Sequence, residues 1–308
     1  MKKQGKTSAL NVAAVCRRLG MSRQNYYAAR KVREKREVEC GEWTRFVRGE
    51  RARHPRMGVR KLLHRYKQAL PESGKPPGRD RAFSDLRDCN LLVPRKKGRP
   101  RTTCSKHNLP LYTNQVKDRE ANEANQIWVS DVTWIDTLEG PLYLSLTTDG
   151  GSRKIVGHHA SDDLKTEGCL RTLNQAQSAL PAGHSPIHHS DRGSQYASHA
   201  HTGRLEELGL TVSMTEKDHC AENALAERMN GILKGEYELD TSFATKAQAR
   251  GAIAQAVKLY NEERPHSALD YQTPAQWHRE SEERTRSRWS PAPLRRATPA
   301  SATRDSNG

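Results

Sequence analysis

The sequence contains no long apolar run. Its hydrophobic stretches fall well short of the ~20 residues that a membrane-spanning helix needs, and only 34% of its 308 residues are hydrophobic. The basic start, Met1 to Thr7, is not followed by the apolar stretch of a signal peptide. We therefore expect a soluble cytoplasmic protein of two or three domains, with no membrane contact and with extended or tail segments.

The sequence also lacks any Cys-x2-Cys pair. Its six cysteines are scattered, at positions 16, 40, 89, 104, 169 and 220. In a reducing compartment such isolated cysteines are free thiols, so a zinc module is not expected.

Negative charge is scarce in the first part of the chain. Residues 1–120 hold 32 Lys and Arg against 11 Asp and Glu, a difference of +21, and since the whole chain carries +16 the other 188 residues carry −5. A basic front end beside a mildly acidic core fits a grip on a polyanion next to a carboxylate metal site. A solvated basic surface would give the same count.

The first residues have the outline of a helix-turn-helix unit. Leu10–Leu19 carries apolar residues on one face, Gly20 interrupts the pattern, and Ser22 is suited to cap a helix over Arg23–Lys31. The outline is typical of DNA-binding pairs, and also of ordinary helical hairpins in protein cores.

Further helices are expected before residue 94. Two lie within residues 31–70, separated near Pro55 and Gly58, and another spans Arg79–Leu92. The last helix offers three cations to phosphates or base edges: Arg79, Arg81 and Arg87. We therefore predict an all-α, helix-turn-helix-type DNA-binding region over residues 1–94.

A basic segment containing proline and glycine follows, with the cations Arg95, Lys96, Lys97, Arg99 and Arg101. Its prolines disfavour a helix, and a Gly-Arg-Pro sequence flanked by cations can lie in an A·T-rich minor groove. A flexible charged linker explains it equally well. Both interpretations predict a domain boundary, and we expect a basic linker over residues 95–124.

From residue 125 short β-rich segments alternate with helices. Strands are expected over Ile127–Ile135, Leu142–Thr148, Lys154–Ala160, Pro186–Ser190 and Thr211–Met214. Helices are expected over Leu164–Leu180, around Leu205–Leu208, over Ala221–Tyr237 and Lys246–Glu263, and near Trp277. This element order is that of an α/β, ribonuclease H-like fold with a five-stranded mixed sheet and flanking helices. We expect it over residues 125–280, with a disordered polar tail over 281–308.

Three carboxylates occupy positions suited to a phosphodiester-cleaving metal site. Asp131 lies inside an apolar strand, where a buried charge is costly unless it is paired or binds a metal. Asp191 directly follows a strand, where α/β folds form ligand sites, and Glu227 lies early in a predicted helix. Two Mg²⁺ ions about 3.5–4 Å apart need such clustered oxygen ligands.

The spacing of these carboxylates is more informative than any one of them. Between Asp131 and Asp191 lie 59 residues, and between Asp191 and Glu227 lie 35. A single Asp is most often a surface or capping residue, but three in these contexts at this spacing predict a catalytic triad.

Short motifs accompany the triad: Trp128-Val-Ser-Asp-Val-Thr-Trp134, Thr148-Asp-Gly-Gly-Ser152, His189-Ser-Asp-Arg-Gly-Ser-Gln-Tyr196, Glu222-Asn-Ala-Leu-Ala-Glu227 and Tyr260-Asn-Glu-Glu-Arg-Pro-His266. Together they make residues 127–277 resemble the integrase core of bacterial insertion-sequence transposases, specifically the OrfB catalytic frame of the insertion sequence three group. That group is related to retroviral integrases. A weaker resemblance continues upstream through Gly78-Arg-Asp80 and covers most of the chain.

The resemblance implies a D-D-35-E enzyme whose catalytic residues and metal ligands are Asp131, Asp191 and Glu227. It implies two Mg²⁺ ions, with Mn²⁺ as a substitute. The activity implied is cleavage of the ends of an insertion sequence followed by strand transfer, in DNA transposition, recombination and integration. A non-enzymatic DNA-binding regulator would leave the triad unexplained, and the motif over 260–266 disfavours a ribonuclease H-like nuclease without transfer activity.

The resemblance also implies partners. These are double-stranded DNA, as terminal inverted repeats and as target, further copies of the chain on paired ends, and an OrfA protein as partner or fusion. The expected location is the bacterial cytoplasm, in association with the nucleoid.

DNA contacts are implied at Lys234, two helical turns after Glu227 on the same face, and at Gln195 and Tyr196 on the loop after Asp191. Asn223 is expected to orient the helix that carries Glu227. The role of the distal residues, packing or function, stays open: Tyr260, Asn261, Arg264 and His266.

The sequence departs from the family at several positions. Glu222 stands where an Asp is usual, Asp218-His219-Cys220 replaces a small glycine-containing loop, and His201 replaces an aromatic residue. Asp270 replaces a glycine. Four more aspartates are expected at turns or on the surface: Asp136, Asp149, Asp162 and Asp163. His188 and His189 are not expected to bind one metal, because strand neighbours point to opposite faces.

Overall fold

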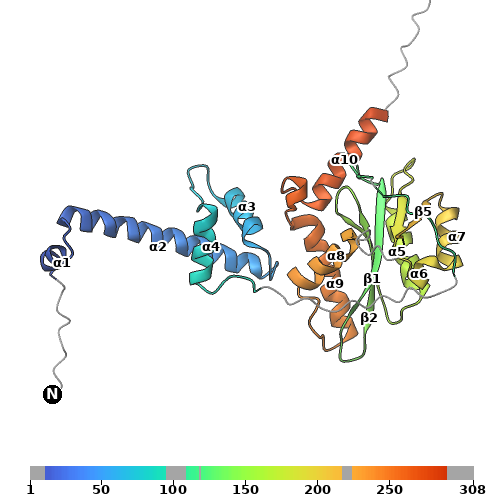
Figure 1. Cartoon of the computed structure of the whole chain (residues 1–308), viewed down its shortest axis with the longest axis horizontal. Coiled ribbons are helices and arrows are strands. Elements are labelled where there is room, and N and C mark those ends of the chain that lie inside the picture. Colours follow the sequence, from blue (N-terminus) through green and yellow to red (C-terminus); the bar gives the residue numbers. More distant parts are fainter. Residues whose placement is uncertain (1–10, 95–108, 118, 217–223, 290–308) are drawn as a thin grey trace, which may run out of the picture.

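The computed structural model describes residues 11–94, 109–117, 119–216 and 224–289. They form an all-helical region followed by an α/β core (Figure 1). Within these ranges no helix is both long enough and apolar enough to cross a membrane.

The helical region contains α1 (Val12–Arg18), α2 (Arg23–Arg51), α3 (Val59–Ala69) and α4 (Arg79–Asp88). The side chains of Asn11 and Ser22 cap the first two helices by accepting backbone N–H bonds. A turn at Gly20, where φ is +65°, separates these helices, so the helix-turn-helix outline is present. The second half of α2 packs with α3 and α4 around a small apolar core: Trp43, Val47, Met57, Leu62, Leu63, Tyr66, Ala82 and Leu86.

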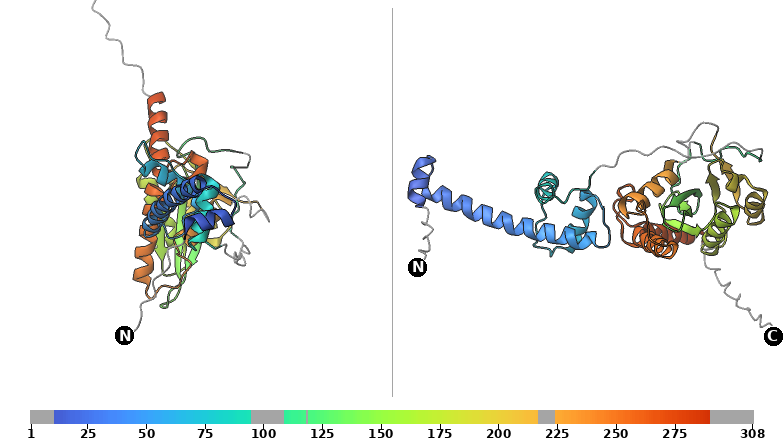
Figure 2. Two further views of the ribbon diagram at one scale, coloured as in Figure 1. Left: turned by 90° about the vertical axis from the view of Figure 1, so that its left-hand side faces the viewer. Right: turned by 90° about the horizontal axis from the view of Figure 1, so that it is seen from below.

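The prediction was wrong about α2, which is one helix of 29 residues rather than an Arg23–Lys31 helix followed by another. No proline interrupts it, and its first half is rich in the strong helix formers Ala, Arg, Lys and Glu. Arg30 pairs with Glu34 one turn later. This first half is largely exposed and carries α1 at its far end, away from the rest of the chain (Figures 1 and 2).

α4 is shorter than predicted and ends at Asp88 instead of Leu92. Asn90 adopts a left-handed backbone with φ of 54°. The N–H of Leu91 bonds back to the carbonyl of Leu86 at 2.7 Å, which closes the helix.

The core sheet contains β1 (Ile127–Ile135), β2 (Leu142–Asp149), β3 (Ile155–Ser161), β4 (Ile187–Ser190) and β5 (Thr211–Met214). Its strand order is β3-β2-β1-β4-β5. The β1–β2 and β2–β3 pairs are antiparallel, and the β1–β4 and β4–β5 pairs are parallel. This five-stranded mixed sheet confirms the predicted ribonuclease H-like core.

Helices cover both faces of the sheet (Figure 1): α8 (Ala224–Glu236) and α9 (Lys246–Glu263) on one, and α5 (Thr166–Ser178), α6 (Ser194–Ala197) and α7 (His199–Glu207) on the other. Leu144 and Leu233 are buried in the first layer, and Trp128 and Leu173 in the second. β3 and α5 approach closely at Gly157, where a Cβ would lie 2.3 Å from the carbonyl oxygen of Thr172.

A short 3₁₀ turn, η2 (Ser267–Leu269), precedes the last helix, α10 (Pro274–Trp289). α10 is longer than the short helix expected near Trp277, and it continues past residue 281, where the sequence predicts a disordered tail. The Ser281 hydroxyl accepts a 2.9 Å bond from the N–H of Ala124, which holds this helix to the start of β1. Residues 290–308 lie outside the described ranges. Asp270, at the position usual for glycine, has a left-handed φ of 50°.

Side chains from two helices form hydrogen bonds with the backbone along the outer edge of β3. Asn261 accepts from the N–H of Ile155 at 2.9 Å and donates to its carbonyl at 3.0 Å. Gln175 accepts from the N–H of His158 at 2.7 Å, and Arg250 donates to the carbonyl of Ala160 at 3.5 Å. The distal residue Asn261 therefore ties α9 to the sheet.

The other distal residues also pack. Tyr260 is fully buried and donates to the carbonyl of Arg153 at 2.9 Å. Arg264 makes two 2.8 Å hydrogen bonds to the carboxylate of Glu236 at the end of α8, and His266 is buried beside them. Packing thus accounts for the distal residues whose role the sequence leaves open.

The helical region contacts the core at this same end of α8. Lys61 of α3 donates to Glu236 at 2.8 Å, and the backbone N–H of Arg56 bonds to the carbonyl of Glu236 at 3.1 Å. The buried His54 lies 3.3 Å from the hydroxyl of Tyr237 and 3.5 Å from Glu263. One end of α8 is therefore held by both parts of the chain.

Candidate active site

The two aspartates of the predicted triad lie side by side in the middle of the sheet. β4 pairs with β1 over four residues and ends with Ser190 opposite Ser130. Asp131 and Asp191 are the next residues on the two parallel strands, which are ~4.8 Å apart. Their side chains therefore meet where β4 ends.

Glu227 lies in the first turn of α8, within the part of that helix that the structure describes. α8 passes over β1 at the aspartates, where the amide nitrogen of Asn230 donates a 2.7 Å hydrogen bond to Oδ2 of Asp131. Because Glu227 precedes Asn230 by three residues, it lies on the same face of the helix. The three predicted residues are thus neighbours, although no three His, Cys, Asp or Glu side chains of the described ranges stand close enough to hold one metal ion.

The carboxylates repel one another. Burial raises the pKa of Asp131 to about 7, and the negative charges of Asp191 and Glu227 act in the same direction. Hydrogen bonds from the backbone at Val132 and from Asn230 oppose the rise. An acidic cluster in which one carboxylate gains a proton this easily is suited to binding a cation.

Asn230 is the residue of this site that the sequence analysis missed. It is 8% exposed, and its own carbonyl oxygen has no hydrogen-bond partner among the described residues. Its position three residues after Glu227 would have indicated that it faces the same strand.

Two of the residues for which DNA contacts were predicted, Gln195 and Tyr196, lie on the short helix α6, soon after β4 ends. Gln195 lies on the surface and donates to the carbonyl of Leu164 at 3.1 Å, so its DNA contact stays a prediction. Tyr196 is only 3% exposed and packs in a buried cluster with Cys169 and Met214. The DNA contact predicted for Tyr196 is wrong in this structure, because its ring cannot reach DNA.

Tyr196 belongs to a buried ring cluster with His188 and His201. The ring of His201 lies 5.2 Å from that of His188 and 5.3 Å from that of Tyr196. His188 is bonded to the hydroxyl of Ser130 at 2.9 Å, whereas His189 is bonded to Ser213 at 2.8 Å. His188 and His189 thus bond to different neighbouring strands, which agrees with the expectation that they do not bind one metal.

We expect His201→Phe to reduce the acid sensitivity of the fold. Burial lowers the pKa of His201 to about 4, below the usual value of about 6.5. The folded protein therefore keeps its full free energy of unfolding above pH 6.5. It loses stability as the pH falls toward 4, because His201 binds a proton more readily in the unfolded chain. At pH 5 this loss of stability is about 2 kcal/mol. Phenylalanine at 201 does not titrate, so the variant does not suffer this loss. The measurement is Tm at pH 7 and pH 5, with the exposed His199→Gln as control; equal acid sensitivity in wild type and His201→Phe would contradict this role.

Lys234 lies one turn after Asn230 on α8. Its ammonium nitrogen is 4.5 Å from the centroid of the Trp134 ring on β1. Glu238, a possible i,i+4 partner, is paired with Arg56 at 2.9 Å. Lys234 therefore lies beside the acidic cluster and over an aromatic ring.

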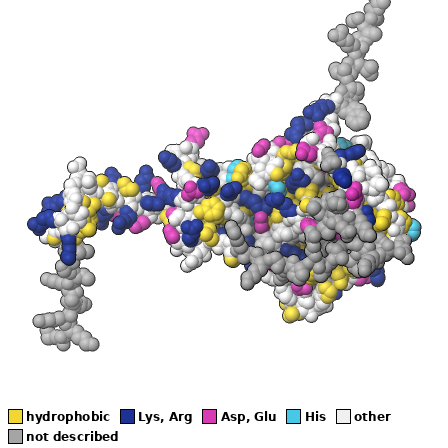
Figure 3. Space-filling model, in the orientation of Figure 1, with side chains coloured by type: hydrophobic (Ala, Val, Ile, Leu, Met, Phe, Trp, Pro, Cys, Tyr) yellow, Lys and Arg dark blue, Asp and Glu magenta, His cyan; other side chains and the backbone are white. Residues whose placement is uncertain are grey.

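The cations predicted to bind DNA differ in their surroundings. Arg81 is paired with Glu39 at 2.8 Å and Asp85 at 3.6 Å, so it stabilises the contact between α2 and α4 and is not available as predicted. Arg79 and Arg87 are exposed, and Figure 3 shows many Lys and Arg side chains on the helical region. The segment 95–108, with its five predicted cations, lies outside the described residues, as do Asn223, Glu222 and the loop 218–220.

Asp149 was expected at a turn or on the surface. It is at a turn but fully buried, where it accepts bonds from the backbone of Asn125 at 2.7 Å and from the backbone and hydroxyl of Ser152 at 2.7 and 2.6 Å. It organises the turn between β2 and β3.

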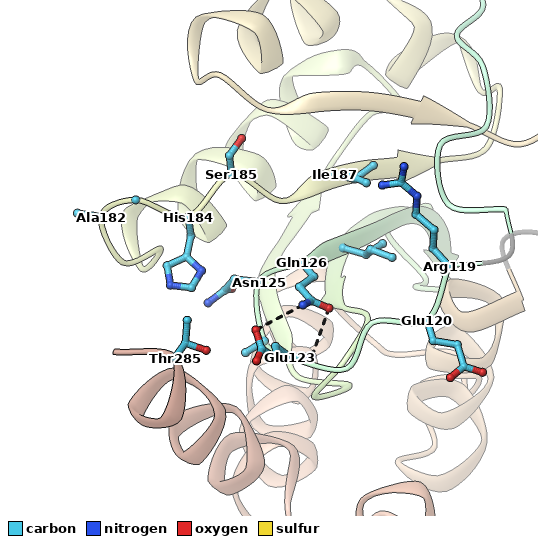
Figure 4. A pocket seen from close by; sticks show the side chains of 13 residues that line it. Arg119, Glu120, Glu123, Asn125, Gln126, Ala182, His184, Ser185, Ile187 and Thr285 are labelled. Atoms are coloured by element: carbon cyan, nitrogen blue, oxygen red, sulfur yellow. Dashed lines mark hydrogen bonds between the residues drawn. The ribbon is translucent and has the colours of Figure 1, made fainter. Parts of the chain in front are cut away.

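The core also contains a pocket of about 550 Å³, lined in part by Asn125, His184 and Thr285 (Figure 4). It is near Ile127 and Ile187, where β1 and β4 begin, whereas Asp191 follows the end of β4. Gln126 and Glu123 bond to each other on its wall. The pocket contains none of the predicted site residues.

The chain matches the known family described as integrase core domain, over residues 121–220 and again over 208–274. The insertion element IS600 31 kDa protein of Shigella sonnei is 34% identical over 213 residues, which is 68% of this chain and 78% of that relative. The chain belongs to the insertion-sequence transposases with an integrase core. The transposase is accordingly an enzyme of DNA transposition and integration, a polynucleotidyl transferase that acts on DNA.

Two further relatives agree with this assignment. The transposase for IS904 of Lactococcus lactis subsp. lactis is 36% identical, with 54% of this chain and 65% of the relative covered. The transposase for IS629 of Shigella sonnei is 34% identical, with 57% and 59% covered. The chain therefore spans somewhat less than two thirds of these two proteins.

Solved structures with a similar arrangement include the HTLV-2 integrase catalytic core domain in complex with magnesium. It has a TM-score of 0.41 and 23% identity, over 50% of this chain and 96% of that one. A simian T-cell lymphotropic virus intasome structure gives a TM-score of 0.45 and 18% identity, over 80% and 77%. The strand order of the sheet and the family match identify the integrase-core fold.

Proposed function

We propose that Asp131, Asp191 and Glu227 are the catalytic carboxylates of this transposase, and that they cleave the ends of an insertion sequence and join them to target DNA. The register of β1 with β4 carries this proposal, because it sets two aspartates side by side where β4 ends. α8 then brings Glu227 to the same place through the contact between Asn230 and Asp131.

The transposase uses divalent metal ions, which we infer to be two Mg²⁺ ions, with Mn²⁺ as a substitute. The three side chains offer only carboxylate oxygens, which hard ions prefer. Bound positive charge would offset the burial and the neighbouring negative charges that together raise the pKa of Asp131. Bound ions would activate water and stabilise the oxygen that leaves phosphorus.

The chain's own residues orient the carboxylates. Asn230 donates to Oδ2 of Asp131, and the N–H of Gly193 donates to Oδ1 of Asp191 at 2.9 Å. In the first step a water oxygen bonds to phosphorus and the bond to the 3′-oxygen breaks, which leaves a 3′-hydroxyl. In the second step that hydroxyl bonds to a target phosphorus and displaces the 3′-oxygen there. No covalent bond to the protein forms.

The test is a cleavage assay with the full chain on labelled duplexes that carry the inverted repeats of its own element, read from the flanking genomic DNA. We expect cutting at the element boundary in Mg²⁺ and none in a chelator. Failure to cut these duplexes with any divalent ion would contradict the proposal.

The proposal includes partners. The basic helical region would bind the terminal repeats, paired ends would hold more than one copy of the chain, and an OrfA protein would add end recognition as partner or fusion. Such a complex would act at the bacterial nucleoid. The residues proposed for DNA contact are Lys234, Gln195, Arg79, Arg87 and the five cations of residues 95–101.

We expect Lys234→Ala to slow cleavage of cognate ends by about 10- to 100-fold, the loss of one charged contact to a phosphate. Nonspecific duplex binding and Tm should barely change, and Lys234→Arg should restore much of the rate because the role needs a cation. Cleavage rates on cognate and scrambled ends measure this, with the exposed Lys258→Ala on α9 as control. An alanine variant that cuts cognate ends at the wild-type rate would exclude a phosphate contact.

A further inference from the structure

The second half of β1 extends past its neighbour. β4 pairs with β1 only from Ile127 to Ser130, while β1 continues to Ile135. Within the described residues this half has a β-sheet partner on the β2 side only. Asp131 begins the half and Trp134 lies near its end.

Trp134 is unusually accessible for a tryptophan in a central strand. Its exposed fraction is 40%, whereas Trp128 of the same strand is fully buried. The ammonium of Lys234 lies 4.5 Å from its ring centroid. An exposed aromatic ring with a cation beside it is the combination with which proteins bind single-stranded nucleic acid.

This ring is connected to the proposed catalytic site through α8. α8 makes two successive contacts with β1, Asn230 with Asp131 and Lys234 with Trp134. The backbones of Asp131 and Trp134 are three residues apart on the strand, which is ~10 Å, the length of about three stacked nucleotides at ~3.4 Å each.

We propose that Trp134 and Lys234 form a subsite for one unpaired nucleobase at the DNA end. The base stacks on the accessible indole surface and Lys234 neutralises an adjoining phosphate. A paired base inside a duplex has both faces covered, whereas an unpaired base can turn a face onto such a ring. The placement of this base next to the cleaved bond rests on the proposed function, whereas the binding itself does not.

The test uses the full chain and two duplexes of one sequence, one blunt and one with a two-nucleotide 3′ overhang that contains 2-aminopurine. Binding is measured without divalent metal, so no catalysis is needed. We expect wild type to prefer the overhang and to quench its fluorescence. Trp134→Ala should lose the quenching and about 5- to 100-fold of affinity for the overhang, with blunt-duplex affinity unchanged. Trp134→Phe should keep part of the quenching and part of the affinity for the overhang.

Trp277→Ala is the matched control, since Trp277 also lies beside a cation, Arg284, at 5.7 Å, but on α10. It should behave as wild type, and Tm should show that each variant is folded. If Trp134→Ala keeps the wild-type ratio of overhang to blunt affinity, or its quenching, the subsite does not exist. Failure of the proposed function would be seen separately, as metal-dependent cleavage that survives loss of a triad carboxylate.

Discussion

Asp131→Asn, Asp191→Asn and Glu227→Gln should each lower the rate of DNA-end cleavage and strand transfer by several orders of magnitude. The amides keep the shape of the side chains, and Asn at 131 can still accept a hydrogen bond from Asn230. They remove the negative charge that would hold divalent ions, which supply most of the rate enhancement in such sites. DNA binding should be nearly unchanged, and folding should be intact or improved at 131, because burial there disfavours the charged form. The measurement is cleavage of a labelled end in Mg²⁺.

Two exposed acidic residues provide matched controls. Asp163 is paired with Lys165 at the surface, and Glu262 is exposed on α9; their amide variants, Asp163→Asn and Glu262→Gln, should cut at the wild-type rate. Near-normal cleavage by any one triad variant would remove that residue from the catalytic site.

Glu236→Gln should destabilise the protein more than the amide variants of the triad carboxylates. Arg264 is nearly buried, and Glu236 binds it through two 2.8 Å hydrogen bonds while also binding Lys61 at 2.8 Å. Without the carboxylate, two cations lose their shared counter-charge at a site with little water. Loss of one partner of such a buried pair costs about 3–5 kcal/mol, and Tm should fall by roughly 6–20 °C.

The pH dependence gives a second measure of this pair. Burial raises the pKa of Glu236, but the hydrogen bonds and charges of Arg264 and Lys61 outweigh it and bring the pKa to about 2. Since this is below the usual value of about 4.3, the stability is complete above pH 4.3 and is lost as the pH falls toward 2. Glu236→Gln should lose this part of the acid transition, with Glu262→Gln as control. A Tm within a degree or two of wild type would show that the pair contributes little.

Much of the core could be predicted because its signals are local. The alternating pattern of Ile127–Ile135 and the turns at Gly140 and Gly150-Gly151 define the first strands. The spacing of Asp131, Asp191 and Glu227 then predicts the candidate site, because each residue lies within or next to a strand or helix that the sequence pattern indicates.

Other features depend on contacts between distant segments. Tyr196 follows Asp191 by five residues, and nothing in that stretch shows that its ring turns inward onto His188 and His201. From the sequence, Arg264 would be taken for a surface cation, and only the folded structure shows its pairing with Glu236. α2 runs on through Lys31 because no residue there stops a helix, although helical patterns on either side suggest two elements.

The side chains along β3 restrict how copies of the transposase can meet. The peptide N–H and C=O groups of an uncovered edge strand can form hydrogen bonds with a strand of another chain. Such strand addition leads to aggregation or to strand exchange. Asn261 satisfies both peptide groups of Ile155, and Gln175 and Arg250 occupy further positions of the same strand. Copies of the transposase are therefore not expected to join by adding a strand at β3, and this edge of the sheet stays closed.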